Sequence, residues 1–425
     1  MARRPGNDCG QARQLEDANP RDCDCRRAAG TVFWTGRAAI FHPAPVRRPV
    51  NAPEKPRRNR LLKHRVRTIF ALLLTPAALA LQFWAARHSE LVETAYSRGI
   101  YPIIASIFST LFGLIPISVA EVLLALAAIV ILCRFFFRLV RLPKTGPIGL
   151  WHGLLKFGAF LSVLFFLFTI WQLNYHREPL AQNLNYKTGT PNKAELVALT
   201  TQEVSAINAL CPLLSWNKQG HSYEAGGFNA VRARVNDAYG RLSAAEDPSN
   251  MLLPRISAYP KAVWPSGLLA HFGIEGIYVP FTFEPTVDTG YPMFLWPFDA
   301  AHESAHLKGF AREDEANYWA YLADCASPDV FFQYSGHMNA LLYLANALGS
   351  TDVSALSAQL EKLDTRAKSD INSYNAYVAK NQGTLSTAAS KVNDSYLKVQ
   401  GQPGVMSYDA FVDLLCDRYR TQTGV

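Results

Sequence analysis

The chain has 425 residues, of which 49% are hydrophobic and 18% charged, and its formal net charge is +8. This length allows two domains, and the apolar share leaves room for membrane spans. Seven cysteines are scattered without a C-x-x-C pair, which excludes a disulfide framework. A single Cys211–Cys416 bridge and buried free thiols at these positions stay open as alternatives.

The first segment is basic. Residues 1–67 carry sixteen Lys and Arg against six Asp and Glu, with much Arg, Pro and Ala and little apolar periodicity. Such a composition cannot bury a core, so we expect a disordered tail. Its last part, residues 57–67, directly precedes an apolar run and serves as the positive flank of a span. We therefore expect no nucleic-acid partner.

Three apolar runs predict transmembrane helices, at residues 68–86, 111–133 and 157–173. The first run has nineteen residues without a charge, long enough to cross a ~30 Å hydrocarbon core. It lacks the small-residue cleavage site of a signal peptide. We therefore expect a membrane region over residues 68–173, in which the interrupted apolar segment 91–110 is a candidate interfacial helix.

Glu121 falls inside the second apolar run. A carboxylate is costly in a membrane and suggests a function or a partner. With Pro116 nearby, the span can also begin later, which would leave Glu121 near the outer interface as a cap or an anchor. Both interpretations stay open.

The charges beside the spans predict the orientation. The tail and the loop 134–156 are basic, and this loop has five basic residues and no acid, whereas the loop 87–110 is balanced. Cytoplasmic loops carry the excess of Lys and Arg, so the tail is expected in the cytoplasm. Residues 174–425 are then expected to form a domain outside the cytoplasmic membrane, and the protein is multi-pass with the lipid bilayer as a partner.

The outer domain is expected to be mainly helical with a small sheet. Asn192–Leu210 and Ala230–Leu242 have apolar residues at helical spacing. The segment 276–283 is β-branched and aromatic and contains Pro280, which predicts an edge strand. Glu284 and Asp288 follow it, either as turn residues on a solvated loop or as groups that bind the amino end of a substrate.

After the central motif, further helices are expected. The segment Met338–Leu348 is an apolar helix, and three helices fit between Ser354 and Tyr419. The turn 401–404 precedes the last of the predicted segments, Ser407–Arg420. The fold class is therefore mainly α.

Residues 302–306 form the pattern H-E-x-x-H. On a helix, His302 and His306 project from one face and can bind a single Zn²⁺, while Glu303 addresses the water on that metal. Zinc with three protein ligands keeps a fourth position for water. We predict that His302 and His306 are zinc ligands and that Glu303 is the general base. A surface helix with two solvated histidines is the alternative.

A third ligand has to come from beyond the motif. Glu313 is in phase with His302, but on a straight helix it would lie about 10 Å beyond His306. Gly309 can end the helix in a left-handed conformation and let the chain turn back. A second helix would then begin at Glu313 and end near Cys325.

The motif and the following residues 313–317 resemble the zincin metallopeptidases whose third ligand is the Glu of an E-x-x-A-[ND] motif. The resemblance implies that Glu313, and not Glu315, is the ligand and that Asn317 orients a ligand histidine. It also implies a zincin-like fold for residues 174–425. In such folds an edge strand precedes the metal helix and binds an extended peptide.

From about residue 68 to the end, the chain is also similar to an uncharacterised family of bacterial three-span membrane proteins with the core H-E-x-x-H-x-x-G-F-x-x-E-x-E-A-N. Matching segments include Asn174–Leu180, Gly276–Thr282 and Val392–Lys398. This resemblance implies an architecture, namely three transmembrane helices followed by one outer domain. It implies no substrate.

The hypothesis from the sequence is a membrane-anchored zinc-dependent hydrolase that acts on a peptide, protein or other amide outside the cytoplasm. Tyr334 or His337 would supply the hydrogen bond that stabilises the oxyanion; a tyrosine that caps the core and a solvated histidine are the alternatives. A different class of function also stays open. In that class the protein is a membrane-anchored scaffold or sensor with a structural metal, or with none.

Overall fold

The computed structural model of the chain describes residues 55–140, 147–247 and 254–424. The predicted tail therefore lies outside the described residues, except for its last part, which begins the first helix. The chain divides into two compact units, Met1–Pro56 and Arg57–Val425. The second unit holds nearly all of the described elements.

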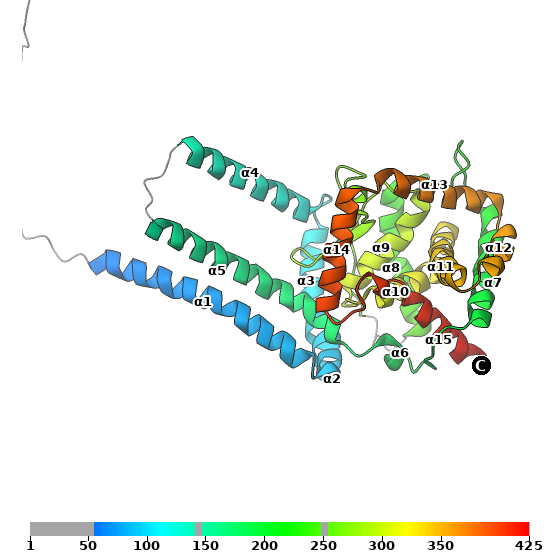
Figure 1. The fold of residues 1–425 in the computed structure, drawn as a ribbon, viewed down its shortest axis with the longest axis horizontal. Coiled ribbons are helices and arrows are strands. Elements are labelled where there is room, and N and C mark those ends of the chain that lie inside the picture. Colours follow the sequence, from blue (N-terminus) through cyan, green and yellow to red (C-terminus); the bar gives the residue numbers. More distant parts are fainter. Residues whose placement is uncertain (1–54, 141–146, 248–253, 425) are drawn as a thin grey trace, which may run out of the picture. The chain divides into compact units, whose positions relative to one another are not determined.

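The described chain is mainly helical with one small sheet, as predicted (Figure 1). The helices of the first part are α1 (Lys55–Ala85), α2 (Ser89–Leu91), the π-helix η1 (Val92–Ile100), α3 (Tyr101–Gly113), α4 (Val119–Val140), α5 (Pro147–Gln172) and the 3-10 helix η2 (Leu173–His176). The helices of the second part are α6 (Leu180–Asn183), α7 (Lys193–Leu210), η3 (Cys211–Leu213), α8 (Gly227–Glu246), η4 (Leu269–Phe272), η5 (Met293–Leu295), α9 (Trp296–Leu307), α10 (Glu313–Ala326), α11 (Val330–Thr351), α12 (Val353–Glu361), α13 (Thr365–Asn381), α14 (Thr384–Val399), η6 (Gly404–Ser407) and α15 (Phe411–Thr423).

Two of the predicted spans are single apolar helices. The segments Leu62–Ala85 in α1 and Trp151–His176, which comprises most of α5 together with η2, are long and apolar enough to cross a membrane. The Thr75 hydroxyl donates to the Ser162 hydroxyl at 2.8 Å and joins the two helices. Among the described helices, Lys193–Leu213 also passes this test, but 44% of its window is buried, so it belongs to the globular part.

The second predicted run is divided between two helices. α3 ends at Gly113 and α4 begins at Val119, because a proline at 116 disfavours helical conformation in the residue before it. The apolar helix of this run is therefore α4, whose described side chains are largely exposed. Glu121 lies in the first turn of α4 and accepts a hydrogen bond from the Trp264 amide at 3.0 Å. It anchors the start of α4 to the rest of the chain.

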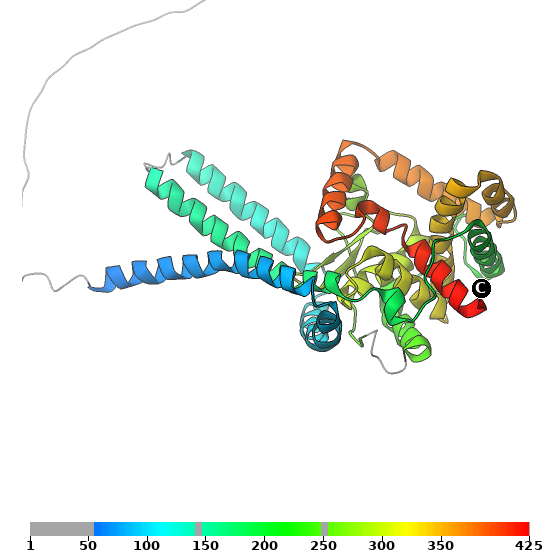
Figure 2. The same ribbon diagram turned by 60° about the horizontal axis from the view of Figure 1, so that its bottom comes forward.

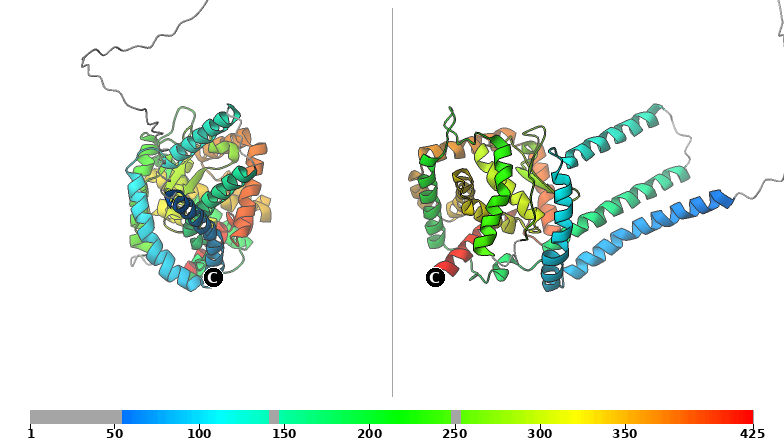
Figure 3. Two further views of the ribbon diagram at one scale, coloured as in Figure 1. Left: turned by 90° about the vertical axis from the view of Figure 1, so that its left-hand side faces the viewer. Right: turned by 180° about the vertical axis from the view of Figure 1, so that it is seen from behind.

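The segment between the first two spans forms η1 and α3. α1, α4 and α5 extend from the same side of the remaining helices (Figures 1 and 2). α3 crosses the ends of these three helices instead of continuing any of them (Figure 3). This is the arrangement expected of an interfacial helix.

The sheet has three strands, β1 (Lys261–Ala262), β2 (Gly276–Val279) and β3 (Glu284–Val287), in the order β1-β3-β2. β3 pairs in parallel with β1 and antiparallel with β2. β2 is thus an edge strand, as predicted, but it ends at Val279. The chain then turns through Phe283, whose φ is 52°, instead of continuing the strand to residue 283.

The prediction that Glu284 and Asp288 lie on a solvated loop is wrong, because both are buried. Glu284 forms an ion pair with Lys261 and accepts hydrogen bonds from the amides of Val119 and Ala120. Asp288 accepts a hydrogen bond from the Gly267 amide in the turn before η4 and, at 2.8 Å, from the Leu269 amide at the start of η4. The first carboxylate caps α4, and the second holds a turn.

α9 is buried along its whole length and lies among α8, α10, α11 and the sheet. Its first turn contains Pro297, which suits the start of a helix because the missing amide needs no partner there. The C-terminal segment holds α12 to α15, one helix more than predicted, because Asp364 caps a separate helix α13. Cys211 and Cys416 are free and buried.

Candidate metal centre

The chain reverses between α9 and α10 as the sequence predicted. α9 ends at Leu307, and Gly309 has a φ of 90°. A Cβ on Gly309 would lie 3.1 Å from the ring of Tyr101, so both the conformation and the space require glycine. α10 then begins at Glu313 with three acidic residues in its first turn, where the helix dipole favours negative charge.

This reversal brings together His302, His306 and Glu313, the three predicted ligands. Their candidate ligand atoms all lie within 4.8 Å of one another. Glu313 Oε2 lies 3.3 Å from His302 Nε2 and 3.4 Å from His306 Nε2. The side chains come from the end of α9 and the start of α10, on opposite sides of the turn.

These distances fit a zinc ion. Zinc binds histidine nitrogen at ~2.0–2.1 Å and carboxylate oxygen at ~2.0–2.2 Å, usually with tetrahedral geometry. In a tetrahedron of that size, neighbouring ligand atoms lie about 3.3–3.5 Å apart. The two measured separations to Glu313 fall there, and two imidazoles with one carboxylate are a common set of ligands for catalytic zinc.

The neighbours of His306 also suit a metal ligand. His306 Nδ1 lies 2.7 Å from the carbonyl of Phe310, which leaves Nε2 to face the cluster. The indole of Trp171 donates to the His306 carbonyl at 3.2 Å. His302 Nδ1 is buried and has no hydrogen-bond partner among the residues that the structure describes.

Without a metal, the cluster carries strongly shifted pKa values. Burial raises the pKa of Glu313, but the two histidines lower it to about 2. Burial lowers the pKa of His306, but Glu313 raises it to about 9. The carboxylate thus stays ionised at neutral pH, which is the form that binds a cation.

Glu303 lies beside the cluster, buried and incompletely paired. Burial raises its pKa to about 7, and it accepts a hydrogen bond from the Tyr278 amide. Its Oε2 has no partner within the described part of the chain. A Cβ on Gly276 would lie 2.7 Å from Glu303 Oε1, so this glycine lets β2 pass directly over the carboxylate. A water molecule between Glu303 and a metal would satisfy the free oxygen.

The predicted role of Asn317 stays a prediction. Asn317 is buried in α10, and its Nδ2 has no partner in the described chain. Its side chain lies beside the hydroxyl of Tyr343. Among the described residues, no hydrogen bond joins Asn317 to His302 or His306, so an orienting role for Asn317 would need a bridging group.

The structure does not bring Tyr334 or His337 to the cluster. The Tyr334 hydroxyl donates to Asp370 at 2.9 Å inside the core. His337 Nδ1 lies 2.6 Å from Glu203 Oε2. Each side chain already has a partner away from the metal ligands.

Three other tyrosines interact with the cluster. Tyr343, Tyr396 and Tyr408 interact electrostatically with Glu313, and burial raises the pKa of Tyr396 to about 12. A tyrosine kept neutral can donate a hydrogen bond to a developing negative charge. The sequence offered one signal, since Tyr396 lies in Val392–Lys398, one of the segments that carry the family resemblance.

Two further acids lie near the ligands. Asp299, one turn before His302, is buried, and its Oδ2 has no partner among the described residues. Burial and the carboxyl of Glu275 raise its pKa well above the usual range. Glu275 precedes β2 and accepts a hydrogen bond from the Tyr374 hydroxyl at 3.0 Å. Neither residue stood out in the sequence.

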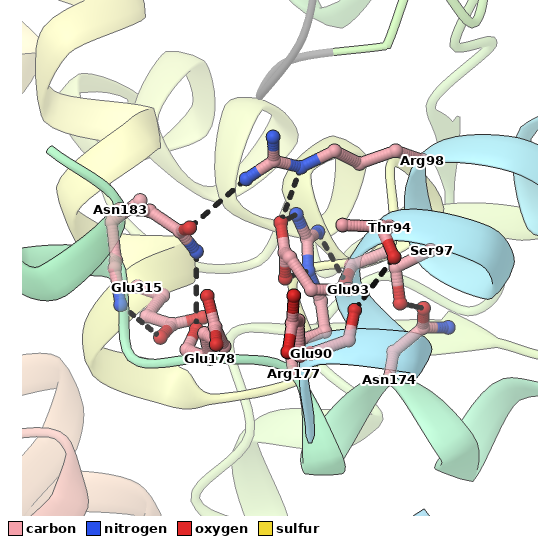
Figure 4. Close-up of polar contacts among 12 residues, drawn as sticks. Glu90, Glu93, Thr94, Ser97, Arg98, Asn174, Arg177, Glu178, Asn183 and Glu315 are labelled. Carbon is pink, nitrogen blue, oxygen red and sulfur yellow. Dashed lines mark hydrogen bonds and ion pairs between the residues drawn. The ribbon is translucent and has the colours of Figure 1, made fainter. Parts of the chain in front are cut away.

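The turn at Gly309 is held from the other side by a buried ionic network (Figure 4). Arg177 donates to Glu93 through Nε and Nη2, both at 2.7 Å, and through Nη1 to the Gly309 carbonyl at 3.0 Å. Arg98 also donates to Glu93. Glu315 points away from the metal ligands, toward the Leu180 amide and Arg312.

A comparison with known proteins places the chain in a family. A family profile matches residues 96–416, which is most of the chain and includes His302, Glu303, His306 and Glu313. No curated protein and no solved structure matches the chain. The chain belongs to the DUF3810 family, which is described as a protein of unknown function.

Proposed function

We propose that the protein is a membrane-anchored zinc-dependent hydrolase that cleaves peptide bonds outside the cytoplasm. The observation that carries this proposal is the cluster of His302, His306 and Glu313 with the incompletely paired carboxylate of Glu303 beside it. A purely structural metal site needs only the ligands. A free carboxylate next to the ligands is what a general base requires.

A Zn²⁺ ion bound there would lower the pKa of a coordinated water towards ~7 and polarise a substrate carbonyl. Glu303 would take the proton of that water and pass it to the departing amine. Its free oxygen, buried beside the ligands, suits a group that first accepts and then donates a proton. Tyr343, Tyr396 or Tyr408 would donate a hydrogen bond to the oxyanion.

The edge strand β2 supports a peptide as the substrate. Tyr278 is paired with Pro285 of β3, which has no amide hydrogen to donate to the Tyr278 carbonyl. The Tyr278 amide donates to Glu303, on the side of the metal ligands. An extended peptide could pair with this edge and place its backbone next to the cluster.

The alternative is a scaffold or sensor with a structural metal. The low exposure of the ligand side chains, 7–11%, favours it, because a structural site needs no access for a substrate. The two functions differ in what Glu303 does. A structural site would be indifferent to its loss.

The test is to replace Glu303 with Gln and to measure zinc per chain together with rescue of a deletion strain. We expect Glu303→Gln to retain zinc and to fail to restore function, because general-base catalysis contributes roughly 10²–10⁴-fold. Glu361→Gln, at an exposed site on α12, is the matched control and should restore function fully. Full rescue by Glu303→Gln with zinc bound would replace the hydrolase with the scaffold.

A further inference from the structure

We infer that the metal centre lies at the membrane surface and that its substrate is the juxtamembrane segment of another membrane-anchored polypeptide. This inference rests on the proposed function, and it adds the class of substrate. Three observations carry it. They are the contacts between α5 and the site, the exposed apolar face of α3 and the exposed apolar face of α14.

The apolar helix α5 directly contacts the site. Trp171, in its last turn, donates to the carbonyl of His306 at 3.2 Å. One turn earlier, the ring of Phe168 lies 5.9 Å from that of Phe281, in the turn after β2. The Trp171 side chain of the candidate span thus contacts the backbone of His306, a candidate metal ligand, directly.

α3 presents an apolar face to the outside. Its buried residues, including Tyr101 and Ala105, face the domain, and the Tyr101 hydroxyl donates to the carbonyl of Leu307 at the end of α9. The opposite face is exposed and apolar at helical spacing, with Ile100, Ile103, Ile107, Leu111 and Leu114. Because α3 crosses the ends of α1, α4 and α5, this face suits the lipid interface (Figure 3).

α14 continues this surface on the other side of α5. The Tyr396 ring lies 6.2 Å from that of Phe168 on α5 and 6.1 Å from that of Tyr175. Val392 and Val399, four residues before and three after Tyr396, share its helix face, yet they are 71% and 82% exposed.

The apolar face of α14 has basic neighbours. Lys391 and Lys398 are exposed beside Val392 and Val399, and Lys398 also forms an ion pair with Asp394 at 2.7 Å. Lysines next to an apolar stripe suit a membrane surface, because their charged ends reach lipid headgroups. Figures 1 and 2 show α14 on the side from which α5 departs. The helix face that contacts the candidate span therefore continues into side chains that lipid can cover.

This position limits what can reach Glu303. The candidate span, α3 and α14 bound one side of the site, and the ligands are nearly buried. A folded soluble protein would have to unfold a segment and bring it against the lipid. A chain that leaves the bilayer next to α5 is already extended at the correct height and can pair with β2.

The first experiment compares the N-termini of proteins in cells that carry wild type or Glu303→Gln. We expect the termini that depend on wild type to lie within roughly ten residues of a membrane span, since an extended residue covers ~3.3 Å. If the N-termini that appear only with the wild-type protein instead lay throughout soluble proteins, this inference would be overturned and the hydrolase would stand. Identical termini in the two strains would overturn the hydrolase, and this inference with it.

The second experiment tests the lipid surface directly. A photo-crosslinking amino acid replaces Val392 or, as a matched control, Val353, which is 70% exposed on α12. In vesicles of phosphatidylethanolamine and phosphatidylglycerol, we expect lipid adducts at position 392 and few at position 353. Equal labelling at the two positions would overturn the placement of α14.

The third experiment tests whether the contact of α14 with lipid is needed for cleavage. Val392→Asp combined with Val399→Asp should keep zinc and yield roughly tenfold fewer dependent termini, because two charges weaken the contact with lipid. Val353→Asp should leave their number unchanged. Full production of these termini by the double variant would contradict a role for this surface.

Discussion

Two buried ionic clusters meet at the turn around Gly309, and they differ in how fully their atoms are paired. In the Glu93–Arg177 network, both carboxylate oxygens accept hydrogen bonds from Arg177, and Arg98 adds another. In the cluster of His302, His306 and Glu313, the neighbouring Glu303 keeps a free buried oxygen. A buried polar group without a partner is costly, so natural proteins rarely leave one without a reason.

This difference distinguishes a cluster that stabilises the fold from a cluster that is the candidate for catalysis. The Glu93–Arg177 network is complete without any ligand, and Arg177 uses its remaining donor to fix the Gly309 carbonyl. In and beside the histidine cluster, His302 Nδ1 and Glu303 Oε2 have no partner among the described residues. The first cluster therefore positions the turn that the second cluster needs, and each variant below breaks one of the two.

The largest expected effect is on the supporting network. Arg177→Met would leave Glu93 buried at 1% exposure with only the partly exposed Arg98 as partner. Removing one member of a buried ion pair costs about 3–5 kcal/mol. The measurement is the free energy of unfolding in detergent. If the Arg177→Met and Glu93→Gln double variant loses the sum of the two single losses, the pair is not a unit.

The next effect is on the metal ligands. Glu313→Gln should weaken zinc binding by more than about 100-fold, since changes to residues around metal ligands already cost 10–100-fold. Glu315→Gln is the control, because Glu315 accepts from the Leu180 amide and Arg312 and faces away from the ligands. The measurement is the zinc affinity of the two variants, determined by titration. Equal losses would show that the cluster is not the metal site.

A smaller effect is expected at the turn that joins the two clusters. Gly309→Ala places a side chain where φ is 90° and where the Tyr101 ring is close, which should cost roughly 1–3 kcal/mol of stability and lower zinc affinity. Gly240→Ala, on an exposed site of α8 with open space around it, should be neutral or stabilising. Thermal unfolding of the two variants, with and without zinc, measures the change in stability and the change in zinc binding.

The sequence predicted the features that depend on neighbouring residues. The spacing of His302, His306 and Glu313, together with Gly309 between them, is local, so helix geometry and one turn predicted that these side chains can meet. The family resemblance then pointed to Glu313, and not Glu315, as the ligand. The edge strand and the apolar helices α1 and α5 also follow from local patterns.

What the sequence missed depends on distant contacts. Tyr396, on α14, interacts electrostatically with Glu313, and Arg177, beyond α5, donates to the Gly309 carbonyl. Glu284 resembles a loop residue until Lys261 and the start of α4 are placed around it. No periodicity or spacing in the sequence indicates such contacts. The sequence therefore pointed to Tyr334 and His337 on α11, which lies closer to the metal ligands along the chain than α14 does.

The smallest expected effect concerns Asp324 and tests whether a buried acid with a raised pKa always belongs to a functional site. Asp324 on α10 is fully buried, and burial raises its pKa well above the usual range. Its folded pKa exceeds its unfolded pKa, so the folded state holds a proton that the unfolded state releases. Above pH ~4 this mismatch destabilises the fold progressively, up to the folded pKa. Asp324→Asn removes the mismatch, so its stability relative to wild type should rise between pH 4 and pH 7, measured by thermal unfolding, while zinc binding stays unchanged. A variant that instead loses zinc or loses stability as the pH rises would show that Asp324 is ionised and belongs to the metal centre.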